Sequence, residues 1–257
     1  MEKITSKNNI IVKDTKKLFN SSKARYENRR FALEGARLCF DVLNSVYKPD
    51  SLFYTEDIYE KYPSEIDALS KEAKQVYVIN SQVSEKLSET KSPQGVFLTV
   101  EMSNGKQAIG NGKIVALDNV QDPANVGAII RSAEALGIDG IVACNCCDVF
   151  NPKTLRASMG SILRMSICVT DDLEQTLSQM KSSGFKVYST VPSTQATKIT
   201  DVDFGNDTVC VIGNEANGVE ENIKAVSDDL ITIPMLGRAE SLNAGVAASI
   251  TMWEMLR

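Results

Sequence analysis

The sequence predicts an α/β protein whose larger, C-terminal part holds a parallel sheet covered by helices on both faces. Short, continuous apolar segments recur from residue 113 onward, and segments with helical spacing separate them. Parallel strands that are buried on both faces produce such continuous apolar segments. A smaller α/β pattern precedes this part. The 257 residues, of which 43% are hydrophobic, are sufficient for two domains with separate cores.

The first 22 residues are predicted to form a basic, polar tail, in which a short helix is left open. Residues 1–37 hold ten Lys/Arg and four Asp/Glu, whereas the whole chain has a net charge of −5. A basic segment on an acidic chain fits a solvated tail, and it equally fits a segment that contacts a polyanion.

Residues 23–100 are predicted to form the smaller α/β domain. The segment RRFALEGARLCFDVLNS places Phe31, Ala32, Ala36, Cys39, Phe40 and Leu43 on one stripe at helical spacing, which predicts a helix. Strands are expected at SLFYT, QVYVI and GVFLTV, and helices at SEIDALSKEAK and SQVSEKLSE. Residues 101–113 contain three glycines and mostly polar side chains, which predicts a linker.

Residues 114–257 are predicted to form the second domain, with its first strand at KIVALD. Further strands are expected at GIVAC, SICVT, KVYST, TVCVIG and ITIPM, with helices between them and one at the end. In open parallel sheets, ligands bind at the carboxyl ends of the strands. The loops after Leu117, Gly213 and Met235 are therefore the expected location of a site.

These three loops carry more polar chemistry than connections need. In LDNVQDPANVGAIIRSAEALG, Asp122 and Pro123 are a typical helix start, and Arg131 lies off the buried face, where it pairs with Glu134 or serves a function. In VIGNEANGV the spacing of Gly213 and Gly218 resembles a phosphate loop, but Val219 stands where lysine is needed.

The third loop, IPMLGRAESLNAGVAAS, places Ser241 and Asn243 at the start of the last helix. Either residue is a suitable N-cap, but one cap needs only one residue. The surplus of polar groups indicates a binding or catalytic role.

Several other classes of protein are disfavoured. No segment is long and apolar enough to span a membrane, no secretory signal is evident, and the six cysteines lack a regular spacing, so a reducing cytoplasm is expected. Cys144 and Cys147 have a C-x-x-C spacing, but no second pair and no histidine completes a zinc site. No metal is expected.

Taken together, these three loops resemble the successive motifs of the SpoU-type RNA ribose methyltransferases of the SPOUT superfamily. The resemblance covers residues 113–257, and the preceding domain is similar to that family's RNA substrate-binding module. It implies S-adenosylmethionine as cofactor, a C-terminal trefoil knot, and a homodimer in which the partner subunit completes each active site. The apolar ridge Val246, Ile250 and Trp253, with Met252 and Leu256 beside it, suits that interface, or else packs on its own sheet.

The resemblance also implies roles for particular residues. The catalytic set implied by it is Asn125, Arg131, Glu215, Ser241 and Asn243. The cofactor-binding set is Thr190, Gly213, Ile233 and Leu242, the third of these in the sixth strand. The cations assigned to RNA are Lys23, Arg25, Arg29 and Arg30 from the basic segment and Lys153 and Arg156 from the acid-free segment 151–170, which alternatively forms an ordinary exposed helix edge. At Gly245 the sequence departs from the family's usual Ser or Val.

The implied reaction transfers a methyl group from S-adenosylmethionine to a ribose 2′-hydroxyl, with ribosomal RNA as the favoured substrate. The chain has no histidine, so the commonest general base is absent. Our hypothesis is that Arg131 clamps the target phosphate and stabilises the developing alkoxide. The alternatives are a transfer-RNA methyltransferase, a non-catalytic RNA-binding protein with the same fold, and a nucleotide-dependent enzyme on an ordinary doubly wound sheet. The last lacks the glycine fingerprint of that class.

Overall fold

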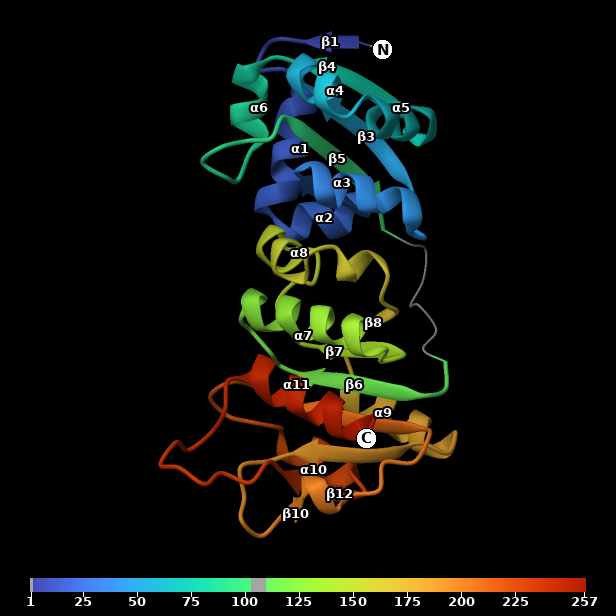
Figure 1. Ribbon diagram of the computed structural model, residues 1–257, viewed down its shortest axis with the longest axis vertical. Helices are drawn as coiled ribbons and strands as arrows, with labels where there is room; N and C mark the ends of the chain where they lie inside the picture. The colour runs from blue at the N-terminus through green and yellow to red at the C-terminus, as the bar shows by residue number, and fades with distance from the viewer. Residues whose placement is uncertain (1, 103–109) are drawn as a thin grey trace. The chain divides into compact units, whose positions relative to one another are not determined.

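The computed structural model describes residues 2–102 and 110–257, and the chain divides into two compact units (Figure 1). Unit 1 comprises Met1–Asn104 and Phe150–Arg164, and unit 2 comprises Gly105–Val149 and Met165–Arg257. The predicted linker, residues 101–113, falls mainly on residues 103–109, which lie outside the described residues.

Unit 1 is built on a five-stranded sheet with the order β1-β4-β3-β5-β2. Its strands are β1 (Glu2–Ile4), β2 (Arg30–Glu34), β3 (Pro49–Tyr54), β4 (Gln75–Ile79) and β5 (Val96–Glu101). Strand β5 runs antiparallel to both β2 and β3, whereas β4 is parallel to β1 and β3.

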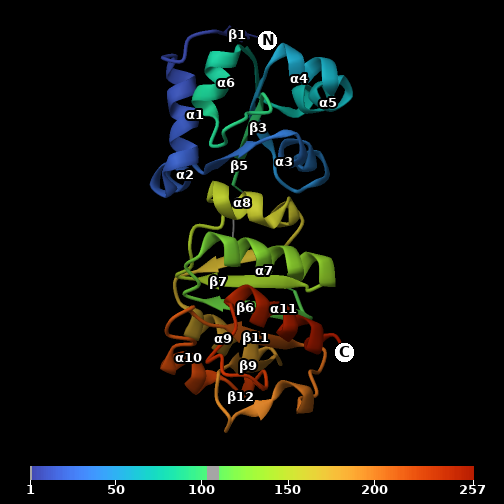
Figure 2. The same cartoon turned by 60° about the vertical axis from the view of Figure 1, so that its left-hand side comes forward.

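Helices cover both faces of this sheet (Figure 2). One face carries α1 (Ile10–Asn20), α2 (Ser22–Asn28) and α6 (Ser81–Leu87), and the other carries α3 (Ala36–Asp41), α4 (Glu56–Lys61) and α5 (Pro63–Glu72). A short 3-10 turn, Val42–Asn44, follows α3. The strands expected at SLFYT, QVYVI and GVFLTV are confirmed, as are the two helices expected between them.

The prediction of a polar tail over residues 1–22 is wrong, although the short helix left open there is present as α1. This segment forms β1 and α1, and α1 buries Val12, Leu18 and Phe19 against the sheet. The apolar residues of IIVKDTKKLF recur at helical spacing, but the surrounding lysines dominate the composition and conceal this face. For residues 1–22, the lysine-rich composition indicates a solvated tail, whereas the spacing of the apolar residues correctly indicates a helix.

The predicted helix over residues 29–45 is correct only in its second half. Arg30–Glu34 is strand β2, which pairs with β5 in antiparallel register, and α3 begins only at Ala36. Gly35 separates the two elements with a φ of 95°, a conformation that glycine adopts readily. The buried residues Phe31, Ala32 and Leu33 fit a strand that is covered on both faces, which the helical stripe does not explain.

A segment far along the chain belongs to unit 1. It contains α8 (Pro152–Ser158) and the 3-10 turn Ser161–Leu163. The ring of Phe150 stacks on Phe31 with centroids 4.5 Å apart, and Arg164 forms an ion pair with Asp41 at 3.2 Å. The predicted domain of residues 114–257 is thus interrupted in this division of the chain by fifteen residues that group with the N-terminal unit.

Unit 2 contains a seven-stranded sheet in the order β10-β12-β9-β11-β6-β7-β8, and every neighbouring pair is parallel. The strands are β6 (Lys113–Asp118), β7 (Gly140–Cys144), β8 (Ile167–Thr170), β9 (Lys186–Thr190), β10 (Thr197–Lys198), β11 (Thr208–Ile212) and β12 (Asp229–Thr232). The predicted parallel sheet is confirmed. The two-residue β10 was not expected, and Ile233 lies just beyond β12 rather than within a strand.

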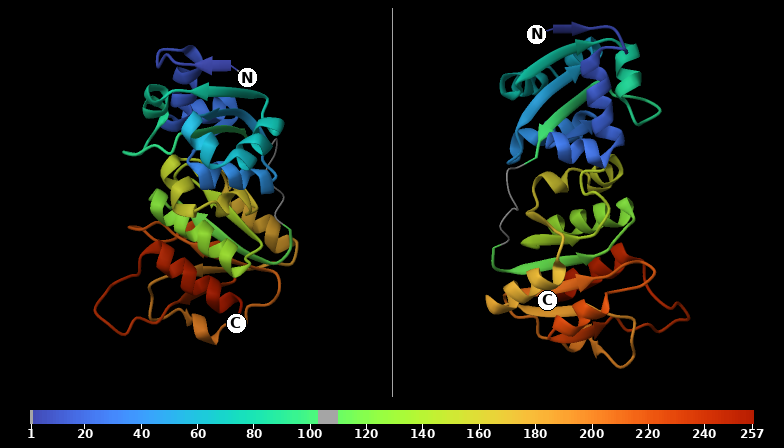
Figure 3. Two further views of the ribbon diagram at one scale, coloured as in Figure 1. Left: turned by 45° about the horizontal axis from the view of Figure 1, so that its top comes forward. Right: turned by 180° about the vertical axis from the view of Figure 1, so that it is seen from behind.

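The helices of unit 2 are α7 (Pro123–Leu136), α9 (Leu173–Ser182), α10 (Glu221–Val226) and α11 (Ala244–Met255), with a 3-10 turn at Ile199–Asp201. Helix α7 begins at Asp122 and Pro123 and ends at Gly137, as predicted. Helix α11 packs beside α7, and the Ser132 and Ser249 hydroxyls lie 3.0 Å apart across that contact. An extended segment, residues 233–243, leads from β12 into α11 (Figure 3).

The predicted ridge on α11 is only partly exposed. Val246, Trp253 and Leu256 are exposed, and Ile250 is half-buried, whereas Met252 lies in the core. Met252 is one position from Trp253, which is 100° around the helix, and it therefore faces the sheet.

Candidate active site

A cavity of about 400 Å³ opens at the carboxyl ends of the central strands of unit 2. Strands β6, β9, β11 and β12 are parallel, so their last residues meet at this one edge. All four predicted cofactor-binding residues line the cavity, namely Thr190, Gly213, Ile233 and Leu242. The catalytic candidates Glu215 and Ser241 line it as well. The structure thus brings these residues together, while their individual roles stay predictions.

A tight turn after β11 shapes one wall of this cavity. Asn214 and Gly218 exchange two backbone hydrogen bonds, and the Asn214 side-chain oxygen accepts from the N–H groups of Ala216 and Asn217. A Cβ at Gly213 would lie 2.2 Å from the Gly218 carbonyl carbon and the Val219 nitrogen. Only glycine at this position lets the strand pass so close to its own turn.

Three of the predicted catalytic residues form one chain of hydrogen bonds. The side-chain amide of Asn125 donates to Glu215 Oε1 at 2.8 Å, and its oxygen accepts from the Asn243 amide at 2.9 Å. Asn243 is also the N-cap of α11, since its oxygen accepts from the N–H groups of Gly245 and Val246. The alternatives posed for Asn243, a cap and a site residue, are therefore compatible in geometry.

Glu215 is held as a carboxylate at the end of this chain. Burial opposes its ionisation, but the Asn125 amide and the backbone N–H groups of Gln121 and Asp122 outweigh burial and keep the pKa of Glu215 below its usual value. Because the folded-state pKa is lowered, ionised Glu215 stabilises the folded site at neutral pH. This contribution is lost only as the pH falls through the lowered pKa.

Gly245 explains how the last helix approaches this network. A Cβ at this position would lie 3.2 Å from the Asn243 oxygen and 3.7 Å from the Asn125 oxygen. The side chain usual for the family would crowd the Asn243 amide in this arrangement. Glycine in place of the family's usual Ser or Val at position 245 therefore fits the close packing of α11 on the Asn243 amide.

The two remaining catalytic candidates stand apart from the hydrogen-bonded chain. Ser241 is exposed and lines the cavity without a side-chain hydrogen bond among the described residues. Arg131 is exposed on α7, does not line the cavity, and makes no ion pair with Glu134 or any other described residue. Arg131 is six positions after Asn125, which places the two side chains about 120° apart around α7.

The cations assigned to RNA have unequal surroundings. Lys23, Arg29 and Lys153 are exposed, Arg156 is half-buried, and Arg30 pairs with Asp50 at 2.9 Å. Arg25 is a correction, because it is only 3% exposed and donates to the carbonyl oxygens of Leu18 and Phe19 at 2.7 and 3.2 Å. It satisfies the C-terminal carbonyls of α1 rather than facing a ligand.

Sequence reasoning missed three polar residues that build the site. Asp118, at the end of β6, accepts from the Glu220 N–H at 2.8 Å, and Asn214 donates to the Asn119 carbonyl at 2.8 Å. Gln121 donates through its side chain to the Asn145 carbonyl at 2.5 Å. Each follows a strand end or lies in a turn, so the rule that directed attention to these loops could have found them.

The described residues show neither an activated cysteine nor a cluster of side chains arranged to bind a metal ion. None of the six cysteines forms a disulfide. Burial raises the pKa of Cys146 to about 12, and its thiol donates to the Cys144 carbonyl. Within residues 2–102 and 110–257, no cluster of three or more His, Cys, Asp or Glu is arranged for a metal ion. Those same ranges contain no helix with the length and apolar character needed to cross a membrane.

Substitution of Asn125 tests the hydrogen-bonded chain. We expect Asn125→Ala to lower the free energy of unfolding by about 1–3 kcal/mol at pH 7, where Glu215 is ionised, because Glu215 and Asn243 each lose a buried partner. We expect Asn125→Asp to cost more at pH 7 than at pH 5, because two carboxylates in contact raise each other's pKa and the penalty falls as one is protonated. Urea unfolding at both pH values measures this. Equal losses for Asn125→Asp at the two pH values would contradict the arrangement.

Comparisons with known proteins agree with this architecture. Residues 112–253 match the SpoU rRNA Methylase family, and residues 9–98 match the MRM3-like substrate binding domain. The chain is 31% identical over 256 residues, 99% of each protein, to the "23S rRNA (guanosine(2553)-2′-O)-methyltransferase RlmP" of Bacillus subtilis. It is also similar to the AdoMet-bound rRNA methyltransferase of Sinorhizobium meliloti, with 30% identity, a TM-score of 0.87, and coverage of 98% of this chain and 96% of that one.

A putative RNA methyltransferase of the TrmH family from Porphyromonas gingivalis gives a TM-score of 0.85 at 27% identity, with coverage of 95% of this chain and 96% of that one. The fold and the cavity at the strand ends thus define a SPOUT-type methyltransferase. The chain belongs to the SpoU rRNA methylase family and is an S-adenosylmethionine-dependent RNA 2′-O-ribose methyltransferase.

Proposed function

We propose that this enzyme methylates a ribose 2′-hydroxyl of ribosomal RNA. The carrying observation is that the RlmP relative, whose name specifies 23S rRNA, aligns over 99% of both chains and thus over the substrate-binding region as well. A transfer RNA substrate is the second candidate. The structure titled "A. aeolicus TrmH/SpoU tRNA modifying enzyme" covers only 57% of this chain. The relative named for 23S rRNA aligns with 99% of it, which favours ribosomal RNA as the substrate.

The cavity of unit 2 fits S-adenosylmethionine. Its volume of about 400 Å³ lies in the usual range for small-molecule sites, roughly 300–1,000 Å³. Ile212, Ile233 and Leu242 give it apolar surface, and the Leu242 N–H and C=O make no hydrogen bond within the described residues. These backbone groups are available to read the adenine edge. When bound, the cofactor supplies a methyl group on a sulfonium, which is a good leaving group.

The residues of this chain act mainly by positioning. Glu215 and Asn125 fix the turn that closes the cavity, and Asn243 joins that turn to the start of α11. Ser241, exposed at the rim, is assigned to the ribose. Alignment of two reacting groups in this way lowers a barrier by several kcal/mol, up to about 10 in favourable cases.

Arg131 is assigned to a site of the partner subunit in a homodimer. Its guanidinium is exposed and lies on α7, the helix that packs beside α11. Helix α11 presents Val246, Trp253 and Leu256 to solvent, and Trp253 is 62% exposed. Large apolar side chains gathered on one helix are typical of a protein–protein interface. In the dimer, Arg131 would clamp the target phosphate and stabilise the alkoxide that develops as the ribose 2′-hydroxyl gives its proton to water or a nearby group.

Two further features belong to this proposal. The C-terminal segment, residues 233–257, forms the trefoil knot of the family, which the packing of α11 against α7 and β11 supports. The enzyme works in the cytoplasm, which the absence of disulfides among its six cysteines supports.

Methyl transfer to bulk RNA tests the substrate. Ribosomal and transfer RNA from cells that lack the protein would be incubated separately with the enzyme and radiolabelled S-adenosylmethionine. We expect label in the 2′-O position of one nucleotide of the large ribosomal RNA, and none in transfer RNA. Label in transfer RNA alone would overturn the ribosomal assignment. Transfer to neither RNA, by protein that binds S-adenosylmethionine, would overturn the proposed function.

A further inference from the structure

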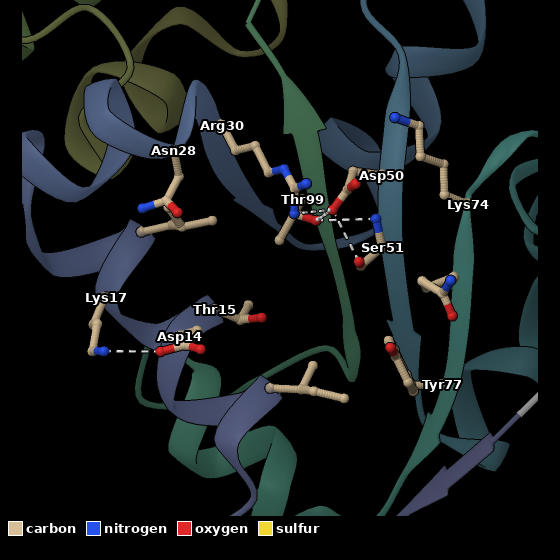
Figure 4. Close-up of a pocket in the computed structure, with 13 residues that line it drawn as sticks. Asp14, Thr15, Lys17, Asn28, Arg30, Asp50, Ser51, Lys74, Tyr77 and Thr99 are labelled. Atoms are coloured by element: carbon tan, nitrogen blue, oxygen red, sulfur yellow. Dashed lines mark hydrogen bonds and ion pairs between the residues drawn. The ribbon is translucent and has the colours of Figure 1, made fainter.

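Unit 1 contains a cavity of about 610 Å³ that is separate from the cofactor cavity. It lies between α1 and the sheet, where the described helices leave polar strand residues uncovered (Figure 4). Its walls come from α1 and from strands β2, β3, β4 and β5. Side chains at the centre of a sheet face are ordinarily apolar, and here they include Asp50, Ser51 and Thr99.

The most buried charge in this cavity is the carboxylate of Asp50, which is 4% exposed. One of its oxygens, Oδ2, accepts from the Ser51 and Thr99 hydroxyls, each at 3.0 Å, and pairs with Arg30 at 2.9 Å. The other oxygen, Oδ1, accepts no hydrogen bond from the described residues. Oδ1 is not one of the buried atoms without a partner, so it is open to the cavity and can accept from an N–H group of a ligand.

Two hydroxyls of largely buried residues on the same walls also lack a partner among the described residues. Tyr77 is 6% exposed, and its ring stacks on Phe53 with centroids 5.0 Å apart. Thr15 of α1 is 5% exposed. Neither hydroxyl makes a hydrogen bond with any described residue, and neither oxygen is one of the buried atoms without a partner, so both are open to the cavity. The cavity therefore combines an acceptor with two groups that both donate and accept.

A second hollow, of about 490 Å³, adjoins the first and shares Asn28 and Arg30 with it. It is lined by the cations Arg29, Arg30 and Lys48, and by one carboxylate, Glu101, which forms an ion pair with Lys74. The first cavity is lined by the carboxylates Asp14 and Asp50 and by the cations Lys17, Arg30 and Lys74, so its charges nearly balance, whereas cations outnumber carboxylates three to one in the second hollow. A phosphate is therefore attracted more strongly to the second hollow.

We propose that these two hollows bind one unpaired nucleotide of the substrate RNA, with the base in the Asp50 cavity and the phosphate against Arg30 and Lys48. Sequence-specific RNA recognition uses unstacked bases whose edges are hydrogen-bonded in such cavities. Asp50 Oδ1 accepts an N–H of the base, and the Tyr77 and Thr15 hydroxyls bond its remaining edge. This inference rests on the proposed function for the identity of the ligand as RNA.

Removal of the two hydroxyls gives a specific test. Tyr77→Phe and Thr15→Val keep the shape of the side chains and remove groups that have no protein partner, so neither variant should lower the melting temperature. The probe is a fluorescently labelled, single-stranded ribo-oligonucleotide of eight mixed bases, and a matched oligonucleotide in which every base is replaced by an abasic site. Fluorescence anisotropy with the full chain gives the dissociation constants.

We expect each variant to weaken binding of the base-containing oligonucleotide by about three- to tenfold, the usual effect of one hydrogen bond, and to leave the abasic one unchanged. The matched control is Tyr59→Phe on α4, which lines neither hollow and should change neither constant. Unchanged binding by both cavity variants would overturn the proposal, as would equal weakening with the abasic probe.

The outcome is separable from that of the proposed function. If the variants lose base-dependent binding but the enzyme methylates transfer RNA and no ribosomal RNA, the nucleotide site is retained and the ribosomal substrate is rejected. If both variants methylate ribosomal RNA normally and bind the oligonucleotide as the wild type does, the ribosomal substrate is retained and the nucleotide site is rejected.

Discussion

Replacement of Arg131 by alanine is expected to lower kcat for RNA methylation by a factor of about 100 or more, the range seen when one oxyanion-stabilising donor is removed. The affinity for S-adenosylmethionine should be unchanged, because Arg131 does not line the cofactor cavity. The thermal stability should also be unchanged, because the exposed guanidinium makes no contact with a charged partner within the described residues. Single-turnover methylation, isothermal titration with the cofactor and thermal unfolding measure the three quantities.

The lysine variant separates the two parts of this role. Lysine retains the charge but cannot form two parallel hydrogen bonds with a phosphate. Arg131→Lys should therefore recover part of the rate lost in Arg131→Ala, with a KM for RNA above that of the wild type. Arg131→Ala with near-normal turnover at saturating RNA would refute the assignment, whichever subunit the arginine serves.

The sequence predicted the sheet of unit 2 more accurately than the elements of unit 1. Parallel strands buried on both faces have an unmistakable composition, as in KIVALD and TVCVIG, and the helices between them begin and end at recognisable caps such as Asp122 and Gly137. In unit 1, the antiparallel β2 carries buried residues at consecutive positions, and these also matched a helical stripe. The pairing partner that decides between the two, β5, lies more than sixty residues away.

The cofactor cavity was predicted in location but not in its internal connections. Polar loops after parallel strands identify the edge of the sheet, and the predicted residues Thr190, Gly213 and Leu242 do share one cavity. The hydrogen bonds from Asn125 to Glu215 and Asn243 join residues 90 and 118 positions apart, and no local pattern specifies them. The angular separation of Asn125 and Arg131, by contrast, follows from helical geometry alone.

Disruption of the apolar surface of α11 is the second change with a large expected effect. Trp253→Glu places a charge at the most exposed aromatic residue of the helix, and burying an unpaired charge in an interface is strongly unfavourable. We expect the variant to be a folded monomer that has lost methyl transfer, as judged by light scattering, circular dichroism and the RNA assay. Val169→Glu, which changes an exposed apolar residue on β8, should stay dimeric and active. A wild-type chain that is monomeric while active would refute the dimer.

Mixing two inactive variants decides whether Arg131 serves its own site or that of the partner. If Arg131 acts across the interface, a heterodimer of Arg131→Ala and Glu215→Ala has one site in which both residues are intact. If it acts within its own subunit, both sites of that heterodimer are defective. Random exchange between equal amounts of the two variants makes half of the dimers heterodimeric. If Arg131 acts across the interface, each heterodimer has one intact site out of two, so we expect roughly a quarter of the wild-type rate. The remaining sites, which lack Arg131, Glu215 or both, contribute little to the rate. No recovery, with heterodimers verified by mass spectrometry, would place Arg131 in the site of its own subunit.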